Sequence, residues 1–111
     1  MILKDFNDVI MEQMDQCKAM LITKGHEYAP EVKCNANVDR LAHFKKAAVL
    51  MNTTPKAALI GMLSKHLISI SDMGTDAKDY PVEQWSEKIT DSINYLLILR
   101  AMVEEEQHEQ D

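Results

Sequence analysis

Three polar side chains near the end of the chain have the types and spacing that suit a hard metal ion. Glu87, Asp91 and Asn94 lie four and three residues apart, so in a helix they would fall within about 60° of one another on one face. Two carboxylates and an amide oxygen are ligands that Mg²⁺ accepts, and such ions often bridge protein carboxylates to nucleotide phosphates. The stripe therefore predicts a Mg²⁺ site; the alternative interpretation is a solvated helix face.

A second polar stripe precedes the first, where Lys65, Ser69 and Asp72 repeat the same spacing. Between them His66 interrupts an apolar row, so its side chain is expected to point inward. The row comprises Leu59, Leu63, Ile70 and Met73. A histidine in such a row is either a hydrogen-bonded core residue or a ligand. If the two stripes face each other, Asp91 would orient and charge the imidazole.

Polar residues also gather where the first helix is expected to end: Lys24, Glu27 and Tyr28. A tyrosine in such a loop usually folds back onto the core and hydrogen-bonds through its hydroxyl. That arrangement would bring Glu27 and Lys24 near the end of the helical array, where they could bind a substrate. Structural packing of Tyr28 is the alternative interpretation.

A small basic group lies on the polar side of the second expected helix, where His43 and Lys45 accompany Arg40 and Lys46. Such a group can hold a small phosphate, so His43 and Lys45 are candidate substrate-binding residues. The chain as a whole has a formal charge of −6 and a pI near 5.1. We therefore expect no nucleic-acid duplex as a partner, because its backbone requires a long basic track.

Four amphipathic helices are expected to position these side chains, because apolar residues recur at intervals of three and four. The expected helices cover residues 5–24, a stretch from Asn35 or Asn37 to Met51, residues 55–73 and residues 81–104. Thr54 before Pro55 gives the clearest helix start, a hydroxyl N-cap followed by proline. Gly25 and Gly74 are the expected helix ends, and the acidic tail 104–111 is expected to be frayed.

Length and composition agree with one all-α domain covering residues 1–111. Apolar residues make up 46% of the chain and aromatic residues 5%, with eight methionines, which suits helix packing better than strands. We predict a four-helix bundle or bundle-like array that forms a homo-oligomer. Cys17 and Cys34 are isolated, as in reduced cytoplasmic proteins, and no apolar run is long enough for a membrane span.

Four motifs in this order resemble small bacteriophage and prophage proteins of the nucleotide-modification-associated type: KGHEY, DRLAHF, SKHLISISDM and EKITDSINYLLILRAMV, which together span residues 24–102. A phage origin would place the protein in the host cytoplasm. The last motif is also distantly similar to MazG-like all-α nucleoside triphosphate pyrophosphohydrolases. In that comparison Asp91 and Glu87 resemble metal-binding acids, whereas Lys88 and the pair Lys65 and His66 stand where further acids are expected.

These patterns support three functional hypotheses. In the first, Glu87, Asp91 and Asp72 hold Mg²⁺, and Lys65 or His66 stabilises the charge that develops when water attacks a nucleoside triphosphate. In the second, a nucleotide or a nucleotide-derived signal is bound without turnover by His66, Lys65, Tyr28 and Asp91. In the third, the chain is a helical interaction module whose polar stripes are solvated.

Overall fold

The computed structural model describes residues 1–23 and 38–110, and this part of the chain contains helices and no strands. The all-α class is thus confirmed. The chain divides into two compact units, Met1–Val38 and Asp39–Asp111, which are described separately.

In its described residues, the first unit contains α1 (Leu3–Lys18), continued by a π-helical segment, η1 (Ala19–Thr23). Helix α1 begins two residues before the expected Asp5, and an ion pair of 2.9 Å joins Lys4 to Asp8 one turn later. The predicted helix end at Gly25 and the predicted loop over residues 26–37 lie outside the described residues.

Helix α2 (Ala42–Leu50) begins later than the asparagines at 35 and 37 led us to expect. A carboxylate oxygen of Asp39 accepts a hydrogen bond from the Leu41 N–H at 2.9 Å, and this local turn delays the helix. At the other end, Asn52 adopts a left-handed conformation with φ of 53°. The N–H groups of Asn52 and Thr53 then satisfy the carbonyls of Val49 and Ala48, which makes a Schellman ending.

Helix α3 (Pro55–Thr75) starts where the sequence predicted, because the Thr54 hydroxyl accepts the Ala57 N–H at 3.2 Å and Pro55 occupies the first turn. The predicted end at Gly74 is wrong, since this residue is still helical. The turn that follows is organised by Asp76, whose carboxylate accepts hydrogen bonds from the Lys78 N–H and the Tyr80 hydroxyl. These bonds lower the pKa of Asp76 and raise that of Tyr80.

Helix α4 (Val82–Gln110) is longer than expected, because it continues through the acidic segment that was predicted to fray from residue 104. The acids have partners: Glu105 pairs with Lys45 of α2 and Glu106 with Lys56 of α3, each at 2.9 Å. Ion pairs to two other helices give this segment tertiary contacts that composition alone does not reveal.

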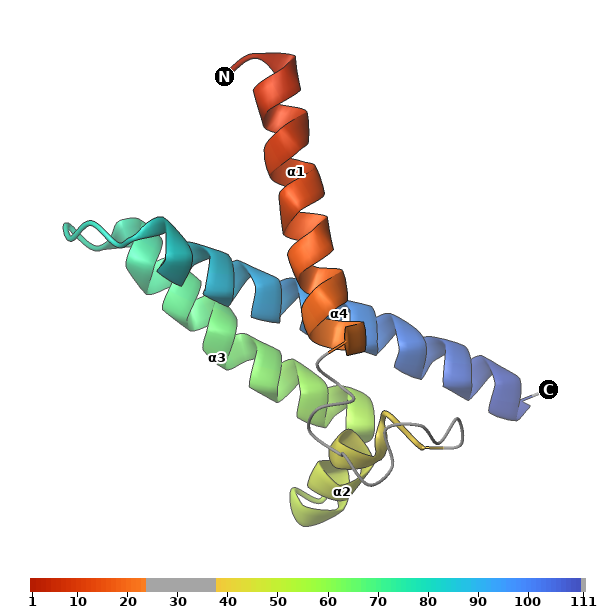
Figure 1. The fold of residues 1–111 in the computed structure, drawn as a ribbon. Coiled ribbons are helices and arrows are strands. Elements are labelled where there is room, and N and C mark those ends of the chain that lie inside the picture. Colours follow the sequence, from red (N-terminus) through yellow and green to blue (C-terminus); the bar gives the residue numbers. More distant parts are fainter. Residues whose placement is uncertain (24–37, 111) are drawn as a thin grey trace. The chain divides into compact units, whose positions relative to one another are not determined.

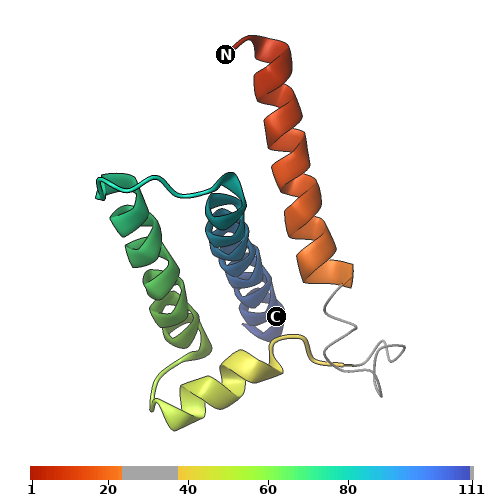
Figure 2. The same ribbon diagram turned by 60° about the vertical axis from the view of Figure 1, so that its left-hand side comes forward.

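Helices α3 and α4 lie side by side and run in opposite directions (Figures 1 and 2). Contacts along the pair define its register, from Lys56 with Glu106 at one end to Gly74 beside Trp85 at the other. Helix α2 lies where α3 begins. The core buried among the three helices consists of Leu41, Phe44, Leu59 and Met102, with Met62, Tyr95, Ile98 and Leu99 packed against it.

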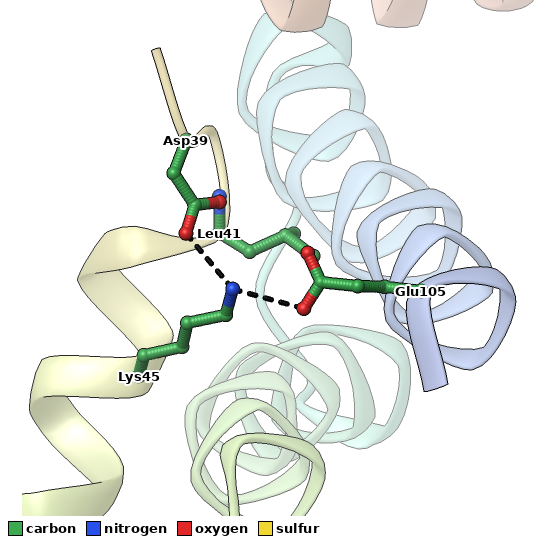
Figure 3. A network of polar contacts seen from close by, with 4 residues as sticks. All are labelled: Asp39, Leu41, Lys45 and Glu105. Atoms are coloured by element: carbon green, nitrogen blue, oxygen red, sulfur yellow. Dashed lines mark hydrogen bonds and ion pairs between the residues drawn. The ribbon is translucent and has the colours of Figure 1, made fainter. Parts of the chain in front are cut away.

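Lys45 links α2 to α4 through a small ion-pair network, shown in Figure 3. Its ammonium group donates to Asp39 at 2.8 Å and contacts Glu105 at 2.9 Å. The hydrogen bond from Lys45, followed by that from the Leu41 N–H, lowers the pKa of Asp39. Bonds to Asp39 and Glu105 raise the pKa of Lys45. The sequence predicted Lys45 as a substrate-binding residue. In the structure its ammonium group takes part in contacts that link α2 to α4.

We expect Leu59→Ala to destabilise the protein by about 2–5 kcal/mol, because Leu59 is completely buried and truncation leaves a cavity in the three-helix core. Urea unfolding followed by circular dichroism measures this change. Leu96→Ala is the matched control, since Leu96 of α4 is 52% exposed, and it should change stability by about 0.5 kcal/mol or less. Equal losses in the two variants would contradict the described core.

Stability should also decrease in acid. The folded-state pKa values of Asp39 and Asp76 lie below the ordinary value of 3.8, so both carboxylates stabilise the fold above about pH 4 and lose this effect as the pH falls through the folded-state values. The melting temperature measured from pH 7 to pH 2 should show this decline. Asp39→Asn combined with Asp76→Asn should make it shallower; an unchanged profile would contradict the two hydrogen-bonded turns.

Candidate functional site

The pairing of α3 with α4 brings His66 to the polar stripe of α4. His66 Nδ1 of α3 lies 4.0 Å from Asp91 Oδ2 of α4, which confirms the inferred approach of these residues. The His66 side chain is 23% exposed and that of Asp91 35% exposed. The separation is too long for a hydrogen bond. A half-buried carboxylate and an imidazole thus face each other where the two helices meet.

His66 Nδ1 is buried and has no hydrogen-bond partner among the described residues. A buried polar atom without a partner costs roughly 1–3 kcal/mol of desolvation, and most such atoms in native proteins are paired. This nitrogen therefore does not support the interpretation of His66 as an ordinary hydrogen-bonded core residue. A ligand that hydrogen-bonds to Nδ1 would supply the missing partner.

Aromatic rings form one wall of this region. The Tyr95 ring lies 5.2 Å from that of His66, tilted by 41°, and its other neighbour is Phe44 of α2 in an edge-to-face contact at 6.3 Å. Sequence reasoning treated Tyr95 only as part of an apolar run. The missed signal is its place four residues after Asp91, which puts both side chains on one face of α4.

Asn94 belongs to the same stretch of α4. Its side chain is buried, and its Oδ1 has no hydrogen-bond partner among the described residues. Nearby Ser92 differs, because its hydroxyl donates to the Lys88 carbonyl at 2.8 Å. Asn94 Oδ1 and His66 Nδ1 are thus the two buried side-chain polar atoms of the described region without a hydrogen-bond partner, and both residues were predicted as site residues.

The other predicted site residues are distributed more widely. Lys65, Asp72 and Glu87 are exposed, and so is His43, which contacts the ring of Phe44 edge-on at 5.4 Å. The predicted ligands Lys24, Glu27 and Tyr28 lie outside the described residues. The structure therefore brings together His66, Asp91 and Tyr95, with Lys65 adjacent along α3.

The predicted metal ligands were tested as a set. Within residues 1–23 and 38–110, no three histidine, cysteine, aspartate or glutamate side chains form a group that could hold a metal ion. Asp72, Glu87 and Asp91 thus do not assemble into a Mg²⁺ site by themselves, and Mg²⁺ binding stays a prediction.

Comparisons with protein-family models, with curated proteins and with solved structures found no match. In the described part of the chain, no helix combines the length and apolar character needed to cross a membrane.

We expect His66→Leu to stabilise the protein by about 1 kcal/mol, because leucine continues the apolar row and removes a buried nitrogen without a partner. Chemical unfolding measures the difference. The control His43→Leu changes an exposed histidine and should have an effect of about 0.5 kcal/mol or less. A clear loss of stability in His66→Leu would show that the imidazole supports the fold rather than a ligand.

Proposed function

We propose that this protein binds a nucleotide or nucleotide-like small molecule at the interface of α3 and α4. The binding region, here named the polar layer, consists of His66, Asp91 and Tyr95, with Lys65 and Asn94 at its border. The observation that carries the proposal is the buried, unpartnered Nδ1 of His66, 4.0 Å from the Asp91 carboxylate. Isolated cysteines favour a cytoplasmic setting.

The chemistry of the polar layer suits a nucleobase. A base has flat apolar faces and carries hydrogen-bond donors and acceptors along its edge, so it can stack on an aromatic ring while its edge is recognised. Tyr95 supplies the ring, tilted against His66. The ionised Asp91 accepts hydrogen bonds from ring or exocyclic N–H groups, and His66 Nδ1 can donate or accept according to its protonation.

A phosphate group would need a cation, and Lys65 is the suitable one. It directly precedes His66 on α3 and its side chain is exposed. Lys45 is less suitable, because its ammonium group already contacts Asp39 and Glu105. The net charge of the chain, −6, favours a ligand with few negative charges over a polyanion.

Metal-dependent release of pyrophosphate would require a Mg²⁺ site in addition to nucleotide binding. Glu87 and Asp91 lie one helical turn apart on α4 and offer two carboxylates, while Asp72 lies on α3. Two carboxylates together with substrate phosphates can bind Mg²⁺, because this ion normally retains several waters. Hydrolysis can therefore be measured on the same samples as nucleotide binding.

The test is a thermal-shift screen against nucleosides, nucleoside mono-, di- and triphosphates and cyclic nucleotides, each with and without Mg²⁺. A ligand at 100 times its Kd should add about 2.7 kcal/mol of stability, which is several degrees for a domain of this size. Pyrophosphate release is measured on the same samples. Stabilisation without release supports binding, whereas release that requires Mg²⁺ supports the hydrolase.

Two variants connect any shift to the polar layer. Asp91→Asn and His66→Leu should each reduce the ligand-induced shift by more than half while the free proteins still melt cooperatively. Asp79→Asn, in the exposed turn before α4, should retain the full shift. If no nucleotide stabilises the wild-type protein, or if both variants respond like it, the proposal is wrong.

A further inference from the structure

The carboxylate of Asp91 is the anionic group of the polar layer, and its oxygens are open to hydrogen-bond donors. The side chain is 35% exposed, and among the described residues His66 is the one basic group within 4.0 Å of it. That separation is too long for a hydrogen bond. An ionised carboxylate only accepts hydrogen bonds, and its two oxygens lie side by side in one plane. Asp91 therefore suits a ligand edge that carries two neighbouring N–H groups.

Among the common nucleobases, guanine has such an edge. Its ring N1–H and its exocyclic N2 amino group are adjacent and point the same way, so they can donate to both oxygens of one carboxylate. Adenine and cytosine carry a ring acceptor beside their amino group, and uracil carries its ring N–H between two carbonyl oxygens. Each of these three bases would make one hydrogen bond to the carboxylate and set a lone pair against its second oxygen, which is repulsive.

We propose that the polar layer binds a guanine base, whose N1–H and N2 amino group donate to the two oxygens of Asp91. This inference rests on the proposed function and deepens it by naming the base. Tyr95 follows Asp91 by four residues, so the two side chains share one side of α4. The Tyr95 ring is therefore available to stack on a base whose edge is held by Asp91.

Two further polar atoms complete the recognition of guanine. Its O6 is an acceptor next to N1–H, and a neutral imidazole can donate one N–H to it. His66 Nδ1 has no partner and is buried, although 23% of the side chain is exposed, so binding turns the ring about its Cβ–Cγ bond to bring the nitrogen to O6. The second hydrogen of the N2 amino group has a candidate acceptor in Asn94 Oδ1, which also has no partner among the described residues.

A guanidinium group, as in arginine, is the other ligand with two parallel N–H groups for a carboxylate. It has no acceptor beside these donors, so it would leave His66 Nδ1 unpaired. The unpartnered nitrogen next to Asp91 therefore favours guanine over guanidinium. Free arginine is the matched control ligand for this distinction.

Isothermal titration calorimetry tests the choice of base. Guanosine, inosine, adenosine, cytidine and uridine are compared, each as its 5′-mono- and 5′-triphosphate and each with and without Mg²⁺, so that within a series only the base differs. The guanine nucleotides should bind about tenfold or more tightly than the others, because a site built for an N–H group rejects ligands that lack it. Inosine is the sharpest comparison, since it keeps N1–H and O6 and lacks only the N2 amino group.

The possible results separate this inference from the proposed function. Tighter binding of another base, or equal binding of all five, would overturn the guanine assignment and leave nucleotide binding standing. Arginine that binds as tightly as guanosine 5′-monophosphate would assign Asp91 to a guanidinium ligand instead. If no nucleotide binds, the proposed function is wrong and the guanine assignment is wrong with it.

Asp91→Asn tests the carboxylate through base preference rather than through loss of binding. Asparagine presents one acceptor and one donor where aspartate presents two acceptors. Xanthine keeps the N1–H of guanine but carries an oxygen in place of the N2 amino group, so its edge complements asparagine. The variant should bind xanthosine 5′-monophosphate more tightly than guanosine 5′-monophosphate, whereas the wild type should show the opposite order.

This reversal distinguishes base recognition from other roles of Asp91. If the carboxylate held Mg²⁺ instead, Asp91→Asn would weaken all nucleotides alike, and a damaged fold would do the same. Asp79→Asn, at an exposed position, is the control and should keep the wild-type order. An Asp91→Asn variant that still prefers guanine over xanthine would refute the inference.

Discussion

The antiparallel contact between α3 and α4 is the constraint on which the second unit depends. It fixes which side of α3 is covered, and it brings His66 to the Asp91 carboxylate. It also places the end of α4 beside the start of α3, where Glu106 pairs with Lys56. Helix α2 can then add Leu41 and Phe44 to a core that already contains Leu59 and Met102. Without this pairing the polar layer would be two separate, solvated stripes.

Local signals explain what could be predicted from the sequence. Thr54 and Pro55 mark the start of α3 because an N-cap and a fixed proline φ act within one turn. Apolar periodicity identified the helices and the inward side of α3. The apolar row that His66 interrupts predicted an inward side chain, and its approach to Asp91 followed from the expectation that the two helices pack side by side.

Long-range interactions explain what could not be predicted. The acidic end of α4 resembles a solvated tail in sequence, but Lys45 and Lys56 from two other helices give it partners. The start of α2 depends on the Asp39 carboxylate, which competes for the first N–H groups of the segment. Tyr95 could not be separated from its apolar neighbours until the position of the His66 ring was known. In each case the deciding partner is remote in the chain or depends on exact side-chain placement.

The attachment of α2 has a consequence for hydrogen exchange. Helix α2 attaches to the pair through nine helical residues, whereas α3 has 21 and α4 has 29, so a local opening of α2 breaks fewer backbone hydrogen bonds. Amides of α2 should therefore exchange with solvent by local opening before those of α3 and α4. Such an opening would withdraw Phe44 from Tyr95 and so uncover the aromatic wall of the polar layer while the rest of the unit stays folded.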